Sequence, residues 1–312
     1  MFFGSEKHKH AQWIKLFVFL LLLGGAFAYG NAVIDAREAI SGNGGNGPGE
    51  TPSDDENDSS DTSLGGAAAE SVTAQQIQAI PDLIAYYNFD SDFRDDSQNN
   101  NDAREEGPGS VSFVPGKRNS GVRFNGQSHL QAAGNPVDVH SMSISLWFRL
   151  DDDDAKDQMK LVMRDMEGAN PRIFQLQVYN KEKNAGDAQI RFNAETDSVA
   201  VWDIGVRTNT TRLRVDVWYH LVVTVKEEEN GVHGEAEVWI NGTRQELLVE
   251  GSRPTRTATF RGRLQTNPSV PLFIGTPEKE QHVLDGVVDE LRLYNRPLTP
   301  REIKLLHKYD AP

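Results

Sequence analysis

The amino-acid sequence predicts an all-β fold: an antiparallel β-sandwich that closes with one short helix. Short runs in which apolar and polar residues alternate recur from Ile80 onward, as expected for strands with one buried face. Asn241-Gly242, between two β-prone runs, is typical of a two-residue hairpin turn. Many short strands, separated by turn residues and accompanied by almost no helix, favour a sandwich over other all-β architectures.

The alternation also predicts which residues face the core, strand by strand. Each predicted strand places every second residue on its inner side. The predicted inner faces are Leu83, Ala85, Tyr87 and Phe89; Ile144, Leu146, Phe148 and Leu150; Phe174, Leu176 and Val178; Ile190 and Phe192; and Leu221, Val223 and Val225.

The stretch Leu284–Leu306 contains the last strand and the predicted helix. Strict alternation places Val287, Asp289, Leu291 and Leu293 on one face of the strand and Glu290 with Arg292 on the other. Pro297 ends the strand, because proline cannot donate to a sheet ladder.

The helix has a clear start. Thr299 is a good N-cap, Pro300 occupies the first helical position, and Glu302 completes a capping box. Ile303, Leu306 and Tyr309 are spaced to form its buried stripe.

The amino terminus, residues 1–33, is predicted to be a signal peptide or an N-terminal membrane anchor. Lysines precede the apolar run Leu16–Leu23, and Ala26-Phe27-Ala28 is a small-x-small pattern that a signal peptidase could cut. The alternative is an uncleaved hydrophobic helix from Trp13 to Val33 that spans a membrane. In both cases the rest of the chain is expected outside the cytoplasm, secreted, periplasmic or anchored.

Residues 34–79 are predicted to be an acidic linker that is rich in glycine and serine. Ser41–Glu70 holds seven acidic residues, no basic one, and Leu64 as its single large apolar residue. Such a segment cannot bury enough surface to fold, so it is expected to be disordered. Ser71–Ala79 has the composition to add a helical turn, and residues 80–312 form the predicted folded domain.

Composition restricts the partners. The chain of 312 residues contains no cysteine and has a formal net charge of −14. An exported domain without cysteine must be held by packing, hydrogen bonds or a metal ion. The acidic excess disfavours nucleic acid and anionic membrane surfaces, so contact with a membrane is expected only through the N-terminal segment.

Several segments of the chain resemble parts of the laminin-G-like jelly-roll domains of the concanavalin A-like superfamily, and they follow one another in the same order as in those domains. The closing stretch carries an Asp-Glu pair on an alternating strand, then Tyr-Asn-Arg and a short helix. The resemblance covers about Ile80 to Pro312 and implies a jelly-roll sandwich, which alone does not imply one activity. The other matching segments are LIAYYNFD (83–90), DDSQNNNDA (95–103), VPGKRNSGVRFNGQSHL (114–130), SMSISLWFRL (141–150), VWYHLVVTV (217–225) and EVWINGTRQ (237–245).

The resemblance implies a structural Ca²⁺ ion. The positions that match the family's ligands are Asp90, Asp96 and Asp289, with Asn99 or a nearby backbone carbonyl completing the shell. The family loop often reads Ser-Gly-Asn-Gly where this chain has Ser97-Gln98-Asn99-Asn100. The alternative is that Asp90 and Asp289 accept only backbone hydrogen bonds and that the loop is a solvated turn.

Carbohydrate binding is the function that such jelly rolls most often imply. Aromatic rings stack on sugar rings, and planar polar groups bind the hydroxyls. Trp147 and Trp218 occupy positions where family members carry packing residues, so Trp202 and Trp239 are the candidate ligand-binding residues. The expected partner is a carbohydrate or glycoconjugate; the alternative is an adhesion or surface-assembly module that binds another surface protein.

No catalytic motif is found in the sequence. Jelly-roll glycosidases carry a Glu-x-Asp-x-x-Glu strand, and the pair Glu235 and Glu237 lacks the third carboxylate. There is no H-E-x-x-H zinc motif and no G-x-S-x-G elbow. The domain is therefore predicted to be non-catalytic, with a glycoside hydrolase as a distant alternative.

Overall fold

The computed structural model describes residues 71–132, 139–152, 158–165, 172–180, 188–198, 204–209, 211–249, 253–277, 282 and 284–310. The chain divides into Met1–Gly65 and Gly66–Pro312, and every described residue belongs to the second unit. The predicted leader and most of the predicted linker lie outside the described residues. Among the described helices, none is long and apolar enough to cross a membrane.

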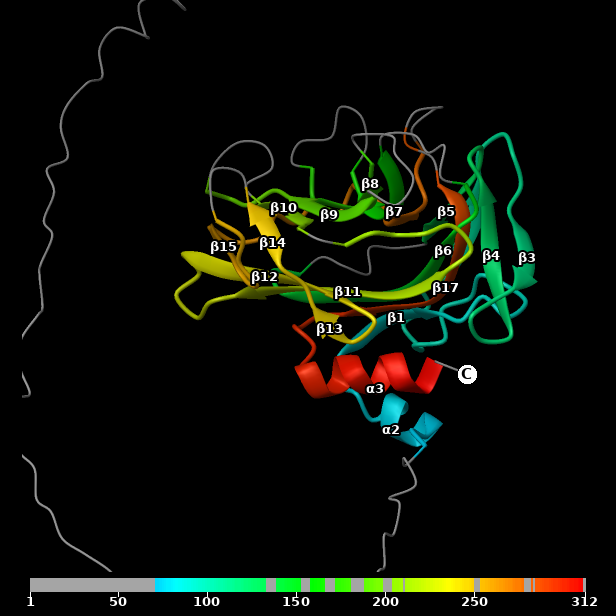
Figure 1. Cartoon of the computed structure of the whole chain (residues 1–312), viewed down its shortest axis with the longest axis horizontal. Helices are drawn as coiled ribbons and strands as arrows, with labels where there is room; N and C mark the ends of the chain where they lie inside the picture. Colours follow the sequence, from blue (N-terminus) through cyan, green and yellow to red (C-terminus); the bar gives the residue numbers. More distant parts are fainter. Residues whose placement is uncertain are drawn as a thin grey trace, which may run out of the picture. The chain divides into compact units, whose positions relative to one another are not determined.

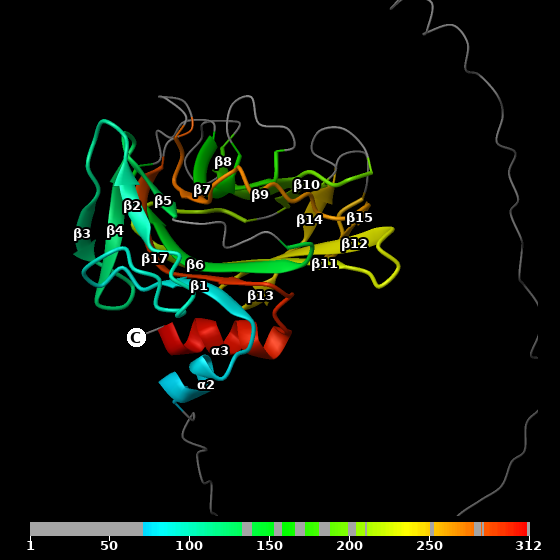
Figure 2. The same cartoon turned by 180° about the vertical axis from the view of Figure 1, so that it is seen from behind.

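Two antiparallel sheets pack face to face, as Figures 1 and 2 show from opposite sides. One sheet has nine strands, with β13-β12-β11-β6-β17-β4-β3 as its main path, β1 paired to β17 and β15 paired to β12. The other has eight, in the order β14-β10-β9-β8-β7-β16-β5-β2. This arrangement confirms the predicted all-β sandwich.

The strands of the nine-stranded sheet are β1 (Leu83–Tyr87), β3 (Ser112–Pro115), β4 (Ser120–Asn125), β6 (Met142–Leu150), β11 (Trp218–Glu227), β12 (His233–Ile240), β13 (Thr243–Arg244), β15 (Ala258–Arg261) and β17 (Asp285–Tyr294). Those of the eight-stranded sheet are β2 (Ala103–Glu106), β5 (His129–Ala132), β7 (Gln158–Arg164), β8 (Phe174–Tyr179), β9 (Gln189–Ala194), β10 (Ile204–Thr208), β14 (Leu247–Val249) and β16 (Phe273–Ile274).

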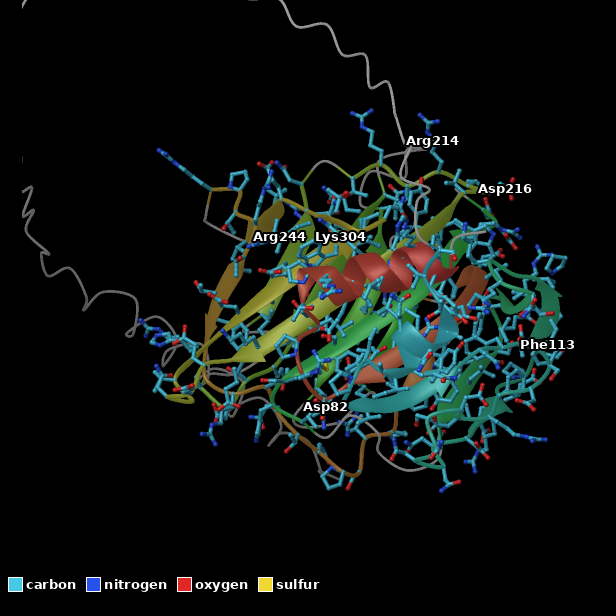
Figure 3. All side chains as sticks on the ribbon, turned by 90° about the horizontal axis from the view of Figure 1, so that it is seen from below. Asp82, Phe113, Arg214, Asp216, Arg244 and Lys304 are labelled. Carbon is cyan, nitrogen blue, oxygen red and sulfur yellow. The ribbon has the colours of Figure 1, made fainter. Side chains whose placement is uncertain are left out.

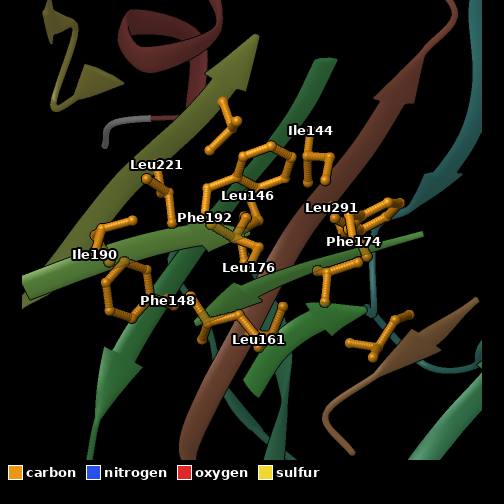
Figure 4. Packing of buried hydrophobic residues seen from close by; sticks show 14 of the residues in the cluster. Ile144, Leu146, Phe148, Leu161, Phe174, Leu176, Ile190, Phe192, Leu221 and Leu291 are labelled. Atoms are coloured by element: carbon orange, nitrogen blue, oxygen red, sulfur yellow. The ribbon is translucent and has the colours of Figure 1, made fainter. Parts of the chain in front are cut away.

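The core lies between the two sheets (Figure 4). With one exception it is built from the alternate residues that the sequence pattern predicts, because a strand sends every second side chain to the same side. The exception is Leu83, which precedes a register shift in β1 and packs with the residues beneath the last helix, Pro300–Asp310, instead. The predicted inner residues of β6, β8, β9 and β11 are all buried in it: Ile144, Leu146, Phe148, Leu150, Phe174, Leu176, Val178, Ile190, Phe192, Leu221, Val223 and Val225.

The last strand departs from the predicted alternation. The pairing of β17 with β6 shifts register between Asp289 and Arg292, and Glu290 has a φ of +53°. This β-bulge turns the chain over, so that Val288 joins Leu291 and Leu293 in the core. The prediction that Val287 and Asp289 share the face of Leu291 is therefore wrong, because the bulge inserts an extra residue between them and Leu291. Strict alternation in the sequence does not indicate this extra residue.

Two helices cover the outer side of the nine-stranded sheet: α2 (Ala74–Gln78) and α3 (Pro300–Asp310) (Figures 1 and 3). The predicted cap of α3 is confirmed, because the Glu302 N–H donates to Thr299 Oγ1 and the Thr299 N–H donates to Glu302 Oε2. Ile303 and Leu306 of α3 pack against Val222 and Tyr294 of the sheet. This helix therefore closes one outer face of the sandwich.

The predicted hairpin turn is also confirmed. Asn241 and Gly242 have φ angles of +50° and +71°, as a type I′ turn requires, and Ile240 pairs with Thr243 across it.

Candidate functional site

The outer side of the eight-stranded sheet is polar along its central strands. On β8, Phe174, Leu176 and Val178 point into the core, so Gln175, Gln177 and Tyr179 point outward. The same alternation holds on β9 and β10 and from Gln158 to Leu161 of β7, after which a register shift places the next residue, Val162, in the core as well. We call this surface the polar face, defined by Gln158, Lys160, Gln175, Gln177, Tyr179, Gln189, Arg191, Asn193 and Arg207.

Strand register arranges these residues in rows across the sheet. Lys160 pairs with Gln177, Gln177 with Arg191, and Arg191 with Arg207. Gln158, Tyr179 and Gln189 form the next row. Because neighbouring strands are about 4.8 Å apart, each row presents a continuous line of polar groups.

One half of the polar face is buried. Lys160 is 2% exposed, and its ammonium group donates to the side-chain oxygens of Gln158, Gln175 and Gln177. Gln175 in turn donates to Asp165. Among the residues that the structure describes, the buried Gln177 Nε2 group finds no hydrogen-bond partner, although buried polar groups nearly always have one. In this half the polar side chains are therefore held in fixed orientations by one another, and the Gln177 Nε2 group is a donor that has no acceptor among them.

The other half is accessible. Tyr179, Arg191 and Arg207 are each partly exposed. The Arg191 guanidinium carbon lies 5.1 Å from the centroid of the Tyr179 ring, and its Nε group donates to Asn193 Oδ1 at 3.1 Å. Stacking of a guanidinium on an aromatic ring fixes the orientation of both groups. An aromatic ring, amides and guanidinium groups thus share one surface.

The predicted ligand-binding residues are not on this face. Trp239 is only 6% exposed and packs in the cluster beneath α3 with Val222 and Leu306. Its Nε1 group donates to Glu237 at 3.0 Å. The prediction that Trp239 stacks on a sugar is inconsistent with this burial, because stacking requires an accessible ring and almost none of this side chain is accessible. Trp202 lies outside the described residues.

The predicted calcium ligand Asp289 is fully buried and accepts hydrogen bonds from three backbone N–H groups. Its Oδ2 accepts from Lys117 at 2.8 Å and from Arg118 at 3.0 Å, and its Oδ1 accepts from Glu290 at 2.8 Å. Burial raises the pKa of Asp289, and the N–H donors act in the opposite direction because they favour the ionised form. Asp289 therefore anchors the turn that follows β3.

Asp90, which follows the first strand of the domain, contacts the same turn as Asp289 of the last strand. Its Oδ1 accepts from the Ser120 N–H at 3.3 Å, and its Oδ2 accepts from Asn119 Nδ2 at 3.1 Å. Asp90 and Asp289 thus hold one turn between the first and last strands, Asp289 through backbone N–H groups and Asp90 through one backbone N–H group and the Asn119 side chain.

Asp96 and Asn99 lie in the loop after β1. Burial and the neighbouring carboxylates of Asp92, Asp95 and Asp90 raise the pKa of Asp96, so Asp90 and Asp96 are close enough to repel each other. The Asn99 amide donates to the carbonyls of Leu83 and Ile84 at the beginning of β1. Asn99 is therefore at the end of the strand away from Asp90.

These positions do not fit one calcium shell made of all four residues. The oxygens of Asp289 are occupied by N–H donors, and Asn99 is directed away from the Asp90–Asp96 pair. Among the described residues, no group of three or more histidine, cysteine, aspartate or glutamate side chains is arranged to hold a metal ion.

The comparison with protein families identifies the fold family. The family model described as the concanavalin A-like lectin/glucanases superfamily matches residues 124–304, more than half of the chain. The chain belongs to this family. A comparison of the sequence with curated proteins found no match.

Solved structures of similar fold include one domain of an arabinanase and the binding domain of a mosquitocidal protein. Domain 4 of AbnA, an extracellular GH43 arabinanase from Geobacillus stearothermophilus, has a TM-score of 0.53 at 20% identity, covering 72% of this chain and 98% of that domain. The binding domain of Paraclostridial Mosquitocidal Protein 1 has a TM-score of 0.52 at 18% identity, covering 74% of this chain and 52% of that domain. At these identities, the similarity shows the shared fold.

Sequence reasoning missed the polar face, although a signal for it was present. The segments FQLQVY and QIRFN alternate core residues with Gln175, Gln177, Tyr179, Gln189 and Arg191. The polar residues between the apolar ones in these two segments predict a sheet whose outer side is rich in side-chain amides.

Proposed function

We propose that this member of the lectin/glucanase superfamily is an exported, non-catalytic carbohydrate-binding module whose glycan site is the polar face. The observation that carries the proposal is the partly exposed Tyr179 side chain, which is stacked with Arg191 and has Gln158 and Gln189 as its cross-strand neighbours. An aromatic platform with planar polar neighbours is the chemistry that sugars require, since a pyranose has an apolar face and a polar rim.

Each row of the polar face has a role in this proposal. The Tyr179 ring receives the apolar face of a sugar, and Gln158 and Gln189 lie in the same row within reach of its hydroxyls. Lys160 holds the buried amides in fixed orientations. Preorganisation reduces the entropy lost when a ligand binds. The arabinanase domain, which shares this fold, was solved in complex with arabinotriose, and this supports an oligosaccharide as the ligand.

The chemistry of the face supports binding rather than hydrolysis. Its defining side chains are amides, cations and one phenol. The carboxylates at its margin are engaged: Asp165 accepts from Gln175, and Glu195 accepts from the Arg172 N–H. Glycoside hydrolysis requires two carboxyl groups placed on either side of one bond.

A glycan array followed by calorimetry on the full chain tests the proposal. Tyr179→Ala is expected to weaken binding of the best glycan by up to about tenfold, because the stacking surface is lost. Phe113→Ala is the matched control, since Phe113 is 41% exposed and lies on β3 of the other sheet. A glycan that binds both variants equally would place the site elsewhere, and failure of every glycan to bind would favour a protein ligand.

Export and calcium remain predictions with their own measurements. Residues 1–33 predict a domain that is accessible to protease outside the cytoplasm, and mass spectrometry then distinguishes a start at Tyr29 from an intact anchor. A calcium ion near Asp90 and Asp96 predicts that chelator lowers the melting temperature and that Asp96→Asn removes this response. Melting that is indifferent to both calcium and chelator would exclude a stabilising ion.

A further inference from the structure

Two arginines face each other on the accessible half of the polar face. Arg191 on β9 and Arg207 on β10 are direct cross-strand partners. Like charges in this arrangement destabilise a sheet. In the described part of the chain, neither guanidinium forms an ion pair: Arg191 contacts Asn193 and the Tyr179 ring, and Arg207 makes no side-chain hydrogen bond. The two guanidinium groups therefore lie side by side, and no carboxylate of the described residues is paired with either of them.

The lack of a carboxylate partner for these two arginines, in the part of the chain that the structure describes, does not result from a shortage of acidic residues in the chain. The chain has 46 acidic and 32 basic residues, so carboxylates are plentiful. On the strands of the other sheet, Arg149, Arg244 and Arg292 each have a carboxylate partner: Asp151, Glu237 and Asp310 respectively. The nearest acidic neighbour in the described strand register is Glu246, on the same face as Arg207, and its carboxylate accepts from Asn209 Nδ2 at 3.4 Å; it forms no ion pair with either arginine.

We propose that the polar face binds an acidic glycan, with a carboxylate or sulfate group held between Arg191 and Arg207 while its sugar ring stacks on Tyr179. This inference deepens the proposed function and rests on it. Adjacent strands bring the two guanidinium groups close enough to share one anion, and each offers the planar fork that binds a carboxylate or sulfate by two hydrogen bonds.

The position of Tyr179 favours an anion that is attached to a sugar over a free anion. Tyr179 pairs with Gln189 in the row beside Arg191, and its ring already stacks on the Arg191 guanidinium. A charged group bound at Arg191 would therefore lie next to the phenol, so that the sugar ring that carries it can contact the part of the Tyr179 ring that Arg191 leaves uncovered.

Calorimetry on the full chain tests the inference with three probes: an oligogalacturonate, the same oligosaccharide with its carboxyl groups reduced, and a sulfated oligosaccharide of equal length. At least one acidic probe is expected to bind about tenfold more tightly than the reduced one. Arg191→Gln and Arg207→Gln are each expected to weaken that binding about tenfold and to reduce its dependence on salt. Inorganic sulfate alone is expected to compete only at far higher concentration.

Arg301→Gln is the matched control, because it removes one positive charge from α3 on the outer side of the other sheet. Arg207→Gln without ligand is expected to melt at the same or a higher temperature, since cross-strand repulsion is relieved. Loss of binding with unchanged melting therefore supports a site. Lower melting of Arg207→Gln together with unchanged binding would overturn the inference.

The possible failures are distinguishable. If acidic and reduced probes bind equally, depend on Tyr179 and ignore both arginine variants, the acidic-glycan inference is wrong and the carbohydrate module stands. If no glycan of any kind binds, the proposed function fails and this inference fails with it.

Discussion

Arg292 of the last strand and Asp310 of the last helix form a buried ion pair, with Arg292 Nη1 donating to Asp310 Oδ2 at 2.9 Å. Arg292 also binds the Glu290 carboxylate and lies 4.3 Å from the centroid of the Tyr86 ring. Tyr86 donates to Glu290 at 2.7 Å. This network joins β1, β17 and α3, and so holds the helix on the sheet in a domain without disulfides.

Removal of one partner from this pair is expected to be costly. Asp310→Ala should lower the free energy of unfolding by about 3 kcal/mol, because the buried Arg292 charge then keeps only one of its two carboxylate partners, Glu290. Asp82→Ala breaks the Arg296–Asp82 pair, in which Asp82 is 49% exposed, and should cost less than about 1 kcal/mol. Urea unfolding measures both, and equal losses would contradict a structural role for the buried pair.

Acid should weaken the attachment of α3. His220 is buried on β11, and its ring lies 5.6 Å from that of His307 on α3, which stacks on Trp147. Burial, together with His307 and Arg292, lowers the pKa of His220 well below its usual value, and burial with Lys117 lowers that of His307. The unfolded chain therefore binds these protons first, and stability should fall as the pH decreases below about 6.5.

The measurement is the difference between variant and wild type, which removes the contribution of other groups. His220→Gln can keep the contact with Ser145 Oγ and should flatten the loss of melting temperature between pH 7.5 and 5.5. His233→Gln, at an exposed position, should leave the profile unchanged. A pH profile that is the same for all three proteins would exclude the buried imidazoles as its cause.

The sequence predicts most of the fold because strand alternation and turn residues are local. The faces of β6, β8, β9 and β11, the Asn241-Gly242 turn and the Thr299 cap each depend on residues a few positions apart. The bulge at Glu290 was not predicted, since an extra residue in a ladder depends on the partner strand.

The candidate site was harder to predict for a different reason. The burial of Trp239 depends on α3, which folds over it from a distant part of the sequence. Likewise, the pairing of Arg191 with Arg207, and of Lys160 with Gln177, depends on which strands become neighbours. Alternation predicts the side to which each residue points, and only the sheet order brings these groups together.

The turn between β3 and β4 should be intolerant of a side chain at Gly116. A Cβ atom there would lie 2.4 Å from the Ser120 carbonyl carbon and 2.6 Å from Asp289 Oδ2. Gly116→Ala is therefore expected to cost about 2 kcal/mol, because the backbone must move and weaken the bonds to Asp289. At Gly121 the nearest atoms would be 3.1 Å away, so Gly121→Ala should cost less. Thermal unfolding that ranks the two variants in reverse would contradict this account.

Trp239 should affect stability and leave glycan binding unchanged. Trp239→Phe removes the Nε1 hydrogen bond to Glu237 and part of the packing with Val222 and Leu306. A loss of about 1–2 kcal/mol in unfolding free energy is expected, since a buried ring is reduced in size and a hydrogen bond is lost. At a temperature where the variant is fully folded, its affinity for the glycan that depends on Tyr179 should equal that of wild type. A selective loss of affinity with unchanged unfolding would instead restore Trp239 as a ligand-binding residue and move the site to the sheet beneath α3.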